Sequence, residues 1–306
     1  MINIFLKVLT TFMFILAGYI LKRMRIISEN VEKKIYFLSF NLLLPTAVAL
    51  NIIFSDFSNI NIHFFSTFFI SGIFILITSY FFGRYTIGLN GNDSSVFGFS
   101  ACYGNLVSIG IPIILSVIGP GNSTPFIILA VSQGIIFIPL TEFLIHRVDD
   151  NRRSLVDLFR GIFFNSLIIG SCLGFIVNYS NVPIHPSLKT LLVPTTVFAL
   201  PSVLVSLGMT IAGISITNSL QKIYILTIIK NIIFPLITFI NAKFVFHLNP
   251  DLTFMATFAA ALPSGIQTYY MSYRYNSLIN IVSKNVLFST LVSVLSLSIL
   301  LMLFGY

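Results

Sequence analysis

Two short segments of this chain combine glycine, proline and polar side chains within otherwise apolar sequence. The first holds Asn105, Ser108, Gly110 and Pro112, and the second holds Pro263, Ser264, Gly265 and Gln267. Glycine and proline weaken a helix, and a helix that stops inside a membrane leaves backbone groups without water to bind. The N–H groups at the start of a helix carry partial positive charge and bind anions readily. The two segments therefore indicate either kinked membrane helices, in which Gly and Pro are common, or a site for a small anion.

The predicted site combines backbone and side-chain donors. We expect Pro112 and Pro263 to break their helices, so that each half-helix beginning at a break presents unpaired amides. The side-chain amides of Asn105 and Gln267 can each donate a hydrogen bond to a carboxylate. For Asn105, the alternative is a hydrogen bond between helices.

Lys230 is the one basic residue placed well within an apolar stretch, residues 221–246. Charge inside a membrane is costly and usually functional, so Lys230 is predicted to attract substrate or to gate its passage. The alternative is that its long side chain extends to the interface near Lys222. Ser108 and Ser264 are candidate ligands too, unless their hydroxyls bond to their own helix backbones.

The elements that must position these residues are membrane helices. The 306-residue chain is 56% hydrophobic and only 8% charged, whereas about a quarter of a soluble domain is charged. Apolar stretches of about 20 residues are long enough to span a bilayer. Ten are predicted: 4–21, 35–54, 63–83, 95–117, 125–145, 161–179, 190–211, 221–246, 252–273 and 281–304. The sequence thus predicts an all-α polytopic membrane protein embedded in the lipid bilayer.

The basic residues indicate the orientation of these spans. Thirteen of the 17 Lys and Arg residues lie in the gaps after spans one, three, five, seven and nine or within the first four residues that follow those gaps. The positive-inside rule places those gaps in the cytosol and both termini outside it. The net charge of +8 comes from these separate gaps and not from a continuous patch, so no nucleic-acid partner is expected.

The two halves of the chain look related. Pro45 in span two and Pro112 in span four are 67 residues apart, and Pro201 in span seven and Pro263 in span nine are 62 apart. Five spans per half is an odd number, so the second half would enter the membrane from the opposite side, as in secondary transporters built from inverted repeats. The predicted parts are a first repeat (1–145), a cytoplasmic linker (146–160) and a second repeat (161–306).

Several motifs together resemble one family. They are Ala260-Ala261-Leu262-Pro263-Ser264-Gly265-Ile266-Gln267, Arg274-Tyr275-Asn276, Gly104-Asn105 with Gly110-Ile111-Pro112, and Lys230 five residues before Pro235. In this order they resemble the auxin efflux carrier family, in its branch of bacterial malate and malonate permeases. The resemblance implies ten transmembrane helices in two inverted five-helix repeats, with spans four and nine broken and crossing near the membrane centre. It also implies an anionic substrate at that crossing, and suggests a homodimer by analogy.

The predicted function is secondary active or facilitative transport of small organic anions, mono- or dicarboxylates, across a bacterial cytoplasmic membrane by alternating access. Coupling to a proton or to sodium is left open, and no metal or cofactor is predicted. One alternative is a cation/proton antiporter, which requires carboxylates at the midplane; spans four and nine contain none. Another is a non-transporting membrane sensor. An enzyme is not expected, because the sequence has no His-Glu-x-x-His and no histidine placed to activate Ser264.

Overall fold

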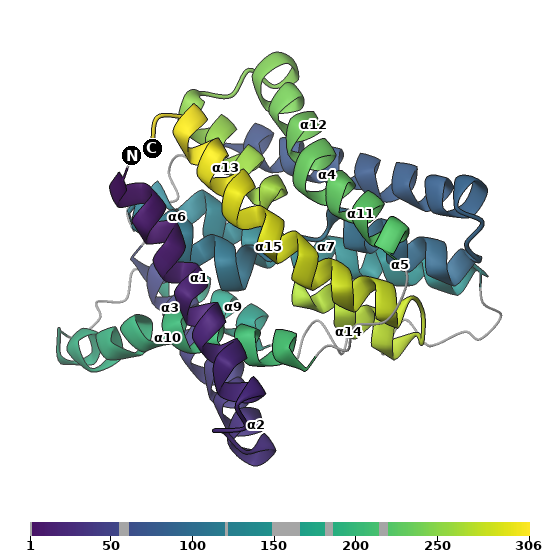
Figure 1. Cartoon of the computed structure of the whole chain (residues 1–306). Coiled ribbons are helices and arrows are strands. Elements are labelled where there is room, and N and C mark those ends of the chain that lie inside the picture. Colours follow the sequence, from purple (N-terminus) through teal and green to yellow (C-terminus); the bar gives the residue numbers. More distant parts are fainter. Residues whose placement is uncertain (1, 55–60, 120–121, 149–165, 181–185, 214–219) are drawn as a thin grey trace.

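The computed structural model describes residues 2–54, 61–119, 122–148, 166–180, 186–213 and 220–306 (Figure 1). Its α-helices in the first half are α1 (Ile2–Arg23), α2 (Glu29–Leu38), α3 (Leu44–Ile53), α4 (Ile62–Phe81), α5 (Gly91–Cys102), α6 (Ile111–Val117) and α7 (Thr124–Val148). Those in the second half are α9 (Ser166–Tyr179), α10 (Pro186–Ala212), α11 (Leu220–Ile228), α12 (Phe234–Ile240), α13 (Pro250–Ala261), α14 (Ile266–Arg274) and α15 (Ile279–Leu303). Five-residue π-helical segments occupy Ser39–Leu43, Phe82–Thr86, Leu106–Gly110, Ile229–Ile233 and Asn241–Val245.

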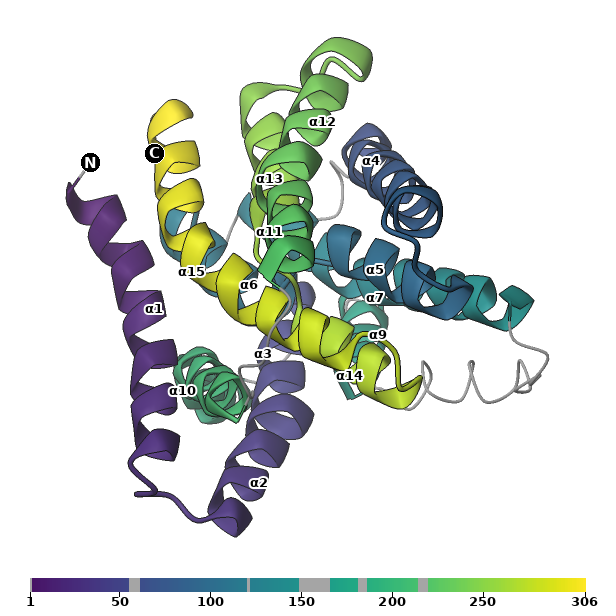
Figure 2. The same ribbon diagram turned by 45° about the vertical axis from the view of Figure 1, so that its right-hand side comes forward.

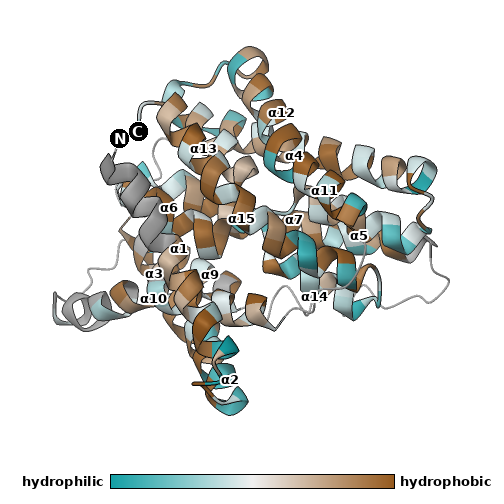
Figure 3. Ribbon diagram, viewed as in Figure 1, coloured by the Kyte–Doolittle hydropathy of each residue, from teal (hydrophilic) through white to brown (hydrophobic). Residues whose placement is uncertain are grey.

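The all-helical prediction is confirmed for the described part of the chain. Helix is present in each of the ten predicted apolar stretches. Four helical stretches are long and apolar enough to cross a membrane: Ile62–Thr86, Thr124–Ile145, Leu220–Val245 and Ile279–Leu303. Shorter apolar helices cover Leu106–Val117, Ile168–Tyr179 and Val197–Ala212. Hydrophobic residues predominate along the helices, while hydrophilic residues gather at ends such as the lower end of α2 (Figure 3). The predicted linker 146–160 lies outside the described residues except for its first three positions.

The helices pack as two groups. In the first bundle (α1, α2, α3, α9 and α10), α1 packs along α10, and α3 packs against both α9 and α10 (Figure 2). In the second bundle (α4 to α7 and α11 to α15), α4 packs on α5, α12 and α13, and α15 packs on α11, α13 and α14. The backbones of α1 and α10 approach closely, since a Cβ atom on Gly208 would lie 1.9 Å from the Ile15 carbonyl oxygen. The first bundle is therefore tightly joined within itself.

The second bundle contains the same local order twice. The α4 stretch ends in the π-helical segment Phe82–Thr86, after which the side chain of Asn90 caps α5 by accepting a hydrogen bond from the Asp93 amide. The α12 stretch ends in the π-helical segment Asn241–Val245, and Asn249 caps α13 in the same way, from the Leu252 amide. Both α5 and α13 are 12 residues long, and both end at an interruption of the helix.

The prediction that Pro112 breaks its helix is wrong. Pro112 is the second residue of α6, and the chain before it remains helical back to Leu106, through a π-helical segment. The hydrogen bonds of such a segment reach five residues back, and the Ile111 amide donates to the Leu106 carbonyl. Pro45 and Pro235 follow π-helical segments in the same way. At these three prolines the shift of the hydrogen-bond register coincides with the residue that lacks an N–H, so each proline is accommodated without a break.

Candidate functional site at the crossing of two broken helices

The two real interruptions lie side by side and pair with each other. The first follows Cys102 and ends where helix resumes at Leu106; the second follows Ala261 and ends where α14 begins at Ile266. Gly104 and Ser264 form an antiparallel β-bridge. In it, the Asn105 amide donates to the Pro263 carbonyl at 2.8 Å, and the Gly265 amide donates to the Tyr103 carbonyl at 3.0 Å. Backbone groups freed by one break are thus partly satisfied by the other.

A side chain from α7 satisfies the remaining backbone groups of the first break. Gln133 donates from Nε2 to the Gly104 carbonyl oxygen at 2.9 Å and accepts at Oε1 from the Gly104 amide at 3.0 Å. Gln133 is 1% exposed, so these bonds replace bonds to water. The first break is therefore held in place by α7, a helix that follows it in the sequence.

Side chains from α15 hold the second break in a comparable way. The Ser264 amide donates to Ser289 Oγ at 3.1 Å, and Asn285 Nδ2 donates to Ser264 Oγ at 2.7 Å. The Ser264 hydroxyl in turn donates to the Ser100 carbonyl of α5 at 2.9 Å. Thr227 donates to Asn285 Oδ1, which extends the network to α11. Ser264 thus bonds across helices, and not to the backbone of its own helix.

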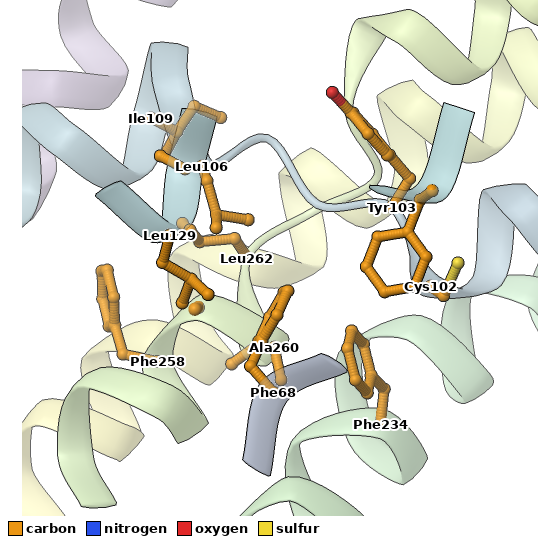
Figure 4. Close-up of a cluster of buried hydrophobic side chains, with 14 of the residues drawn as sticks. Phe68, Cys102, Tyr103, Leu106, Ile109, Leu129, Phe234, Phe258, Ala260 and Leu262 are labelled. Carbon is orange, nitrogen blue, oxygen red and sulfur yellow. The ribbon is translucent and has the colours of Figure 1, made fainter. Parts of the chain in front are cut away.

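Apolar side chains enclose one side of the crossing. Phe68, Leu129, Phe234 and Phe258 come from four different helices and are buried in one cluster with Leu106 and Leu262 of the two breaks (Figure 4). Such packing excludes water from that side and fixes the breaks in place.

A cavity of about 350 Å³ lies on the other side of the crossing, between the two bundles. The first bundle contributes Tyr36, Phe40, Asn41, Leu44, Ser166 and Ile168 to its lining. The second bundle contributes Tyr103, Gly104, Asn105, Val107, Ser108, Ala130, Val131, Gln133, Gly134, Ile138, Glu142, Gly265, Ile266, Gln267, Tyr270, Met271 and Arg274. The residues of the crossing are buried, whereas Gln267 and Tyr270 further along α14 are exposed, so the crossing forms the closed end of the cavity.

Asn105 lies at this closed end with one hydrogen-bonding group unused. Its Oδ1 accepts from the Ser108 amide at 3.3 Å, which caps the following helical segment. Its side chain makes no hydrogen bond to another helix among the described residues, and its Nδ2 atom is buried there without a partner. A buried amide that lacks a partner carries a desolvation cost, which a ligand acceptor would remove.

The predicted site residues fall into two groups. Asn105, Ser108, Gly265 and Gln267 line the cavity. Gly110, Pro112, Pro263, Ser264 and Lys230 are not among its lining residues. Of this second group, Pro263 and Ser264 bond within the crossing, and Gly110 allows close packing, since a Cβ there would lie 2.6 Å from Leu262 Cδ1.

Lys230 lies behind the crossing. Its side chain is fully buried, its Nζ donates to the Ala260 carbonyl at 2.6 Å, and it lies 4.7 Å from the centre of the Phe234 ring. It does not extend to an interface. Ala260 is in the last turn of α13, where helix carbonyls are unpaired and carry partial negative charge. The structure therefore places this ammonium group at a helix C-terminus.

The residues that support the crossing were not predicted from the sequence. Gln133, Asn285 and Ser289 hold the two breaks, and Glu142 of α7 forms an ion pair with Arg274 of α14 at 2.7 Å. Their types offered a signal, because amides and charges inside apolar helices of a membrane protein usually bond to another helix. Their partners are far away in the sequence, however, and only the fold pairs them.

Comparison with known proteins adds one match. A family model described as "Membrane transport protein" matches residues 3–301, which is nearly the whole chain. No protein with a curated description matches the chain.

Proposed function

Since the chain belongs to the auxin efflux carrier family of membrane transport proteins, we propose that it is a secondary transporter of small organic anions, mono- or dicarboxylates. The observation that carries this proposal is the closed end of the cavity. There, the buried Nδ2 of Asn105 has no partner among the described residues. Asn105 directly precedes the helical segment that begins at Leu106, and its backbone amide bonds to Pro263, shortly before α14 begins at Ile266. Donors and helix N-termini in one place favour negative charge.

The substrate-binding residues in this proposal are those that line the cavity near the crossing. Asn105 donates to a substrate carboxylate through Nδ2, and Ser108 and Gln267 supply further polar groups. Gly265 allows the two breaks to approach, because a Cβ there would lie 2.9 Å from the Gly104 carbonyl oxygen. Gly110, Pro112, Pro263, Ser264 and Lys230 act indirectly, by shaping and stabilising the crossing.

The charge of the lining argues against cation/proton antiport. Cation binding at the midplane requires an accessible carboxylate. Glu142 is the only acidic residue in the part of the lining that the structure describes, its side chain is 3% exposed, and it is already paired with Arg274. A polar cavity with its carboxylate neutralised in this way suits an anion better than a cation.

The proposed architecture is ten spans in two inverted repeats, 1–145 and 161–306, with α5–α6 and α13–α14 as the broken spans. It is supported by the repeated order of π-helical segment, Asn cap and 12-residue helix before each break. The antiparallel pairing of the breaks agrees with opposite directions through the membrane. By the positive-inside rule, both termini are outside the cytosol, and the Arg274 end of the cavity faces the cytosol of a bacterial cell.

Alternating access then requires the second bundle to move against the first. The cavity lies between the two bundles, so such a motion would expose its closed end to the opposite side. One hydrogen bond that crosses between the bundles joins the hydroxyl groups of Tyr270 and Tyr36 at 3.2 Å. It is exposed and neutral, and is therefore easily exchanged for bonds to water.

Uptake by proteoliposomes containing the purified chain tests this function. Radiolabelled acetate, malonate and malate are supplied in turn, and Asn105→Ala is compared with the wild type. We expect uptake of at least one acid above that of empty liposomes, and its loss in Asn105→Ala with normal insertion and folding. The matched control is Asn30→Ala on the exposed surface of α2, which should transport normally.

Two outcomes would contradict the proposal. Uptake of none of the acids by folded wild-type protein would favour a non-transporting sensor. Full uptake by Asn105→Ala would remove the proposed site. Imposed proton and sodium gradients in the same liposomes test whether either ion is coupled to transport, and the mass of the detergent-purified protein tests the homodimer suggested by analogy.

A further inference from the structure

The ion pair between Glu142 and Arg274 lies on the same cavity as the crossing but at its other end. Gln133 and Glu142 are nine residues apart on α7, and Gly265 and Arg274 are nine residues apart along α14. At 1.5 Å per residue, both helices place the pair about 13 Å from the crossing. A four-carbon dicarboxylate is shorter than this separation. One such molecule would therefore occupy the two ends in turn, and not at the same time.

The two partners of this ion pair are unequally exposed. Arg274 Nη1 lies 2.7 Å from Glu142 Oε1, and the Glu142 side chain is only 3% exposed, whereas that of Arg274 is 42% exposed. A guanidinium group has five N–H donors. Within the described part of the chain, one of the Arg274 donors is bonded to Glu142, and the Tyr275 ring lies 5.7 Å from Arg274 Cζ. The cation thus has donors left to offer to a solute in the cavity, while the anion is enclosed by protein.

Among the described residues, Arg274 is also the only basic one that lines the cavity. A carboxylate entering from the exposed end therefore meets one fixed cation before it reaches the neutral amide of Asn105. The planar fork of a guanidinium matches the two oxygens of a carboxylate.

We infer that Arg274 forms a second, outer carboxylate-binding subsite at the mouth of the cavity, and that Glu142 is the positioning residue that holds its guanidinium against the cavity wall. The inference rests on the proposed function in one respect: the anion bound at Arg274 is the one that later reaches Asn105. Glu142 has two opposing effects on the subsite. Its oxygen orients Arg274, and its negative charge lowers the attraction of Arg274 for an anion.

The test compares two substitutions with opposite expected effects. Arg274→Gln removes the cation and should raise the KM for malonate uptake on the order of tenfold, as expected for a lost charge-assisted hydrogen bond, with less change in maximal rate. Glu142→Gln keeps an oxygen that can accept from Nη1 but removes the charge, so it should lower the KM severalfold. Arg274→Lys keeps the charge and should recover most of the affinity. The matched control, Arg25→Gln, alters an exposed arginine outside the cavity lining and should leave KM unchanged.

A purely structural ion pair would behave differently. Both Arg274→Gln and Glu142→Gln would then impair folding or maximal rate in the same direction, and that result would overturn the inference. So would an unchanged KM in Arg274→Gln.

A second measurement does not depend on transport. Phenylglyoxal modifies accessible arginines, and mass spectrometry of the detergent-purified full chain gives the rate of modification at Arg274. Malonate should slow this rate at least threefold compared with chloride at equal ionic strength. In Glu142→Gln, the same protection should require a lower malonate concentration. Protection without any uptake would support the subsite while contradicting the proposed transport. Uptake without protection would support transport and overturn the subsite.

Discussion

The side-chain amide of Gln133 satisfies both backbone groups of Gly104, donating to its carbonyl and accepting from its amide at 2.9 and 3.0 Å. Gly104 is the middle residue of the three that separate the end of α5 at Cys102 from the next helical segment, which begins at Leu106. A helix break in an apolar environment is tolerated only where its freed groups find partners in the protein or in water. Gln133 therefore allows the chain to be non-helical at the closed end of the cavity.

We expect Gln133→Leu to lower the stability of the folded protein. Leucine fills a similar volume but leaves two buried backbone groups unsatisfied, at a cost of about 1–3 kcal/mol each. Thermal unfolding of the detergent-purified protein measures the loss. Gln267→Leu is the matched control, because Gln267 lines the same cavity but is exposed; its melting temperature should stay close to that of the wild type. Equal melting temperatures for both variants would contradict the role of Gln133.

Lys230→Met should reduce maximal transport rate and leave KM nearly unchanged. Lys230 does not line the cavity, and its Nζ binds the Ala260 carbonyl behind the crossing. Its removal leaves a buried carbonyl unpaired, which costs about 1–3 kcal/mol and loosens the crossing. Uptake kinetics in proteoliposomes separate the two parameters. A KM raised more than tenfold at normal maximal rate would instead support direct attraction of substrate by Lys230.

Gly265→Ala should destabilise the protein by about 1–3 kcal/mol, as for an overpacked interior. The added Cβ would lie 2.9 Å from the Gly104 carbonyl oxygen and 2.9 Å from the Tyr103 ring. The carbonyl oxygen belongs to the backbone, so no change of side-chain rotamer can relieve that contact. Gly134→Ala is the matched control, since a Cβ on this glycine of the same cavity meets nothing nearer than 3.4 Å. Chemical denaturation compares them, and equal stabilities would count against tight pairing of the breaks.

Linking Tyr36 to Tyr270 should stop transport. Their hydroxyls are 3.2 Å apart and belong to different bundles, so a bridge there would prevent one bundle from moving against the other. Cysteines at both positions, in a Cys172→Ser background, can be joined by a bifunctional maleimide long enough to replace two tyrosine side chains. The native Cys102 stays in this background, because it is buried. Each protein with only one of the two introduced cysteines, treated with the same reagent, serves as control. Continued transport by the fully linked protein would argue against alternating access between these bundles.

Much of the helical organisation could be predicted because it depends on local composition. Apolar stretches long enough to span a bilayer must satisfy their backbone within themselves, and helix is the solution open to a single segment. Helix is accordingly found in each of the ten predicted stretches. The grouping of Gly, Pro and Asn also identified the neighbourhood of both breaks, including Asn105 at the closed end of the cavity.

The position of the first break could not be predicted from proline. Pro112 cannot donate a backbone hydrogen bond, but the π-helical segment before it shifts the bonding pattern by one residue. The same shift precedes Pro45 and Pro235. The chain instead leaves the helix at Tyr103, where the backbone finds new partners in Pro263, Gly265 and Gln133.

The sequence by itself determined that this protein is helical and apolar, which family it belongs to, and which two segments are irregular, because these depend on residue types and on spacing along the chain. The tertiary structure alone decided what the polar residues do. It set Lys230 behind the crossing, joined Gln133 to Gly104, and paired Glu142 with Arg274, residues separated by most of the second half of the chain. The reason is that the role of a polar side chain in an apolar interior depends on its hydrogen-bond or ion-pair partner. That partner is brought near only by the packing of helices that are distant in the sequence.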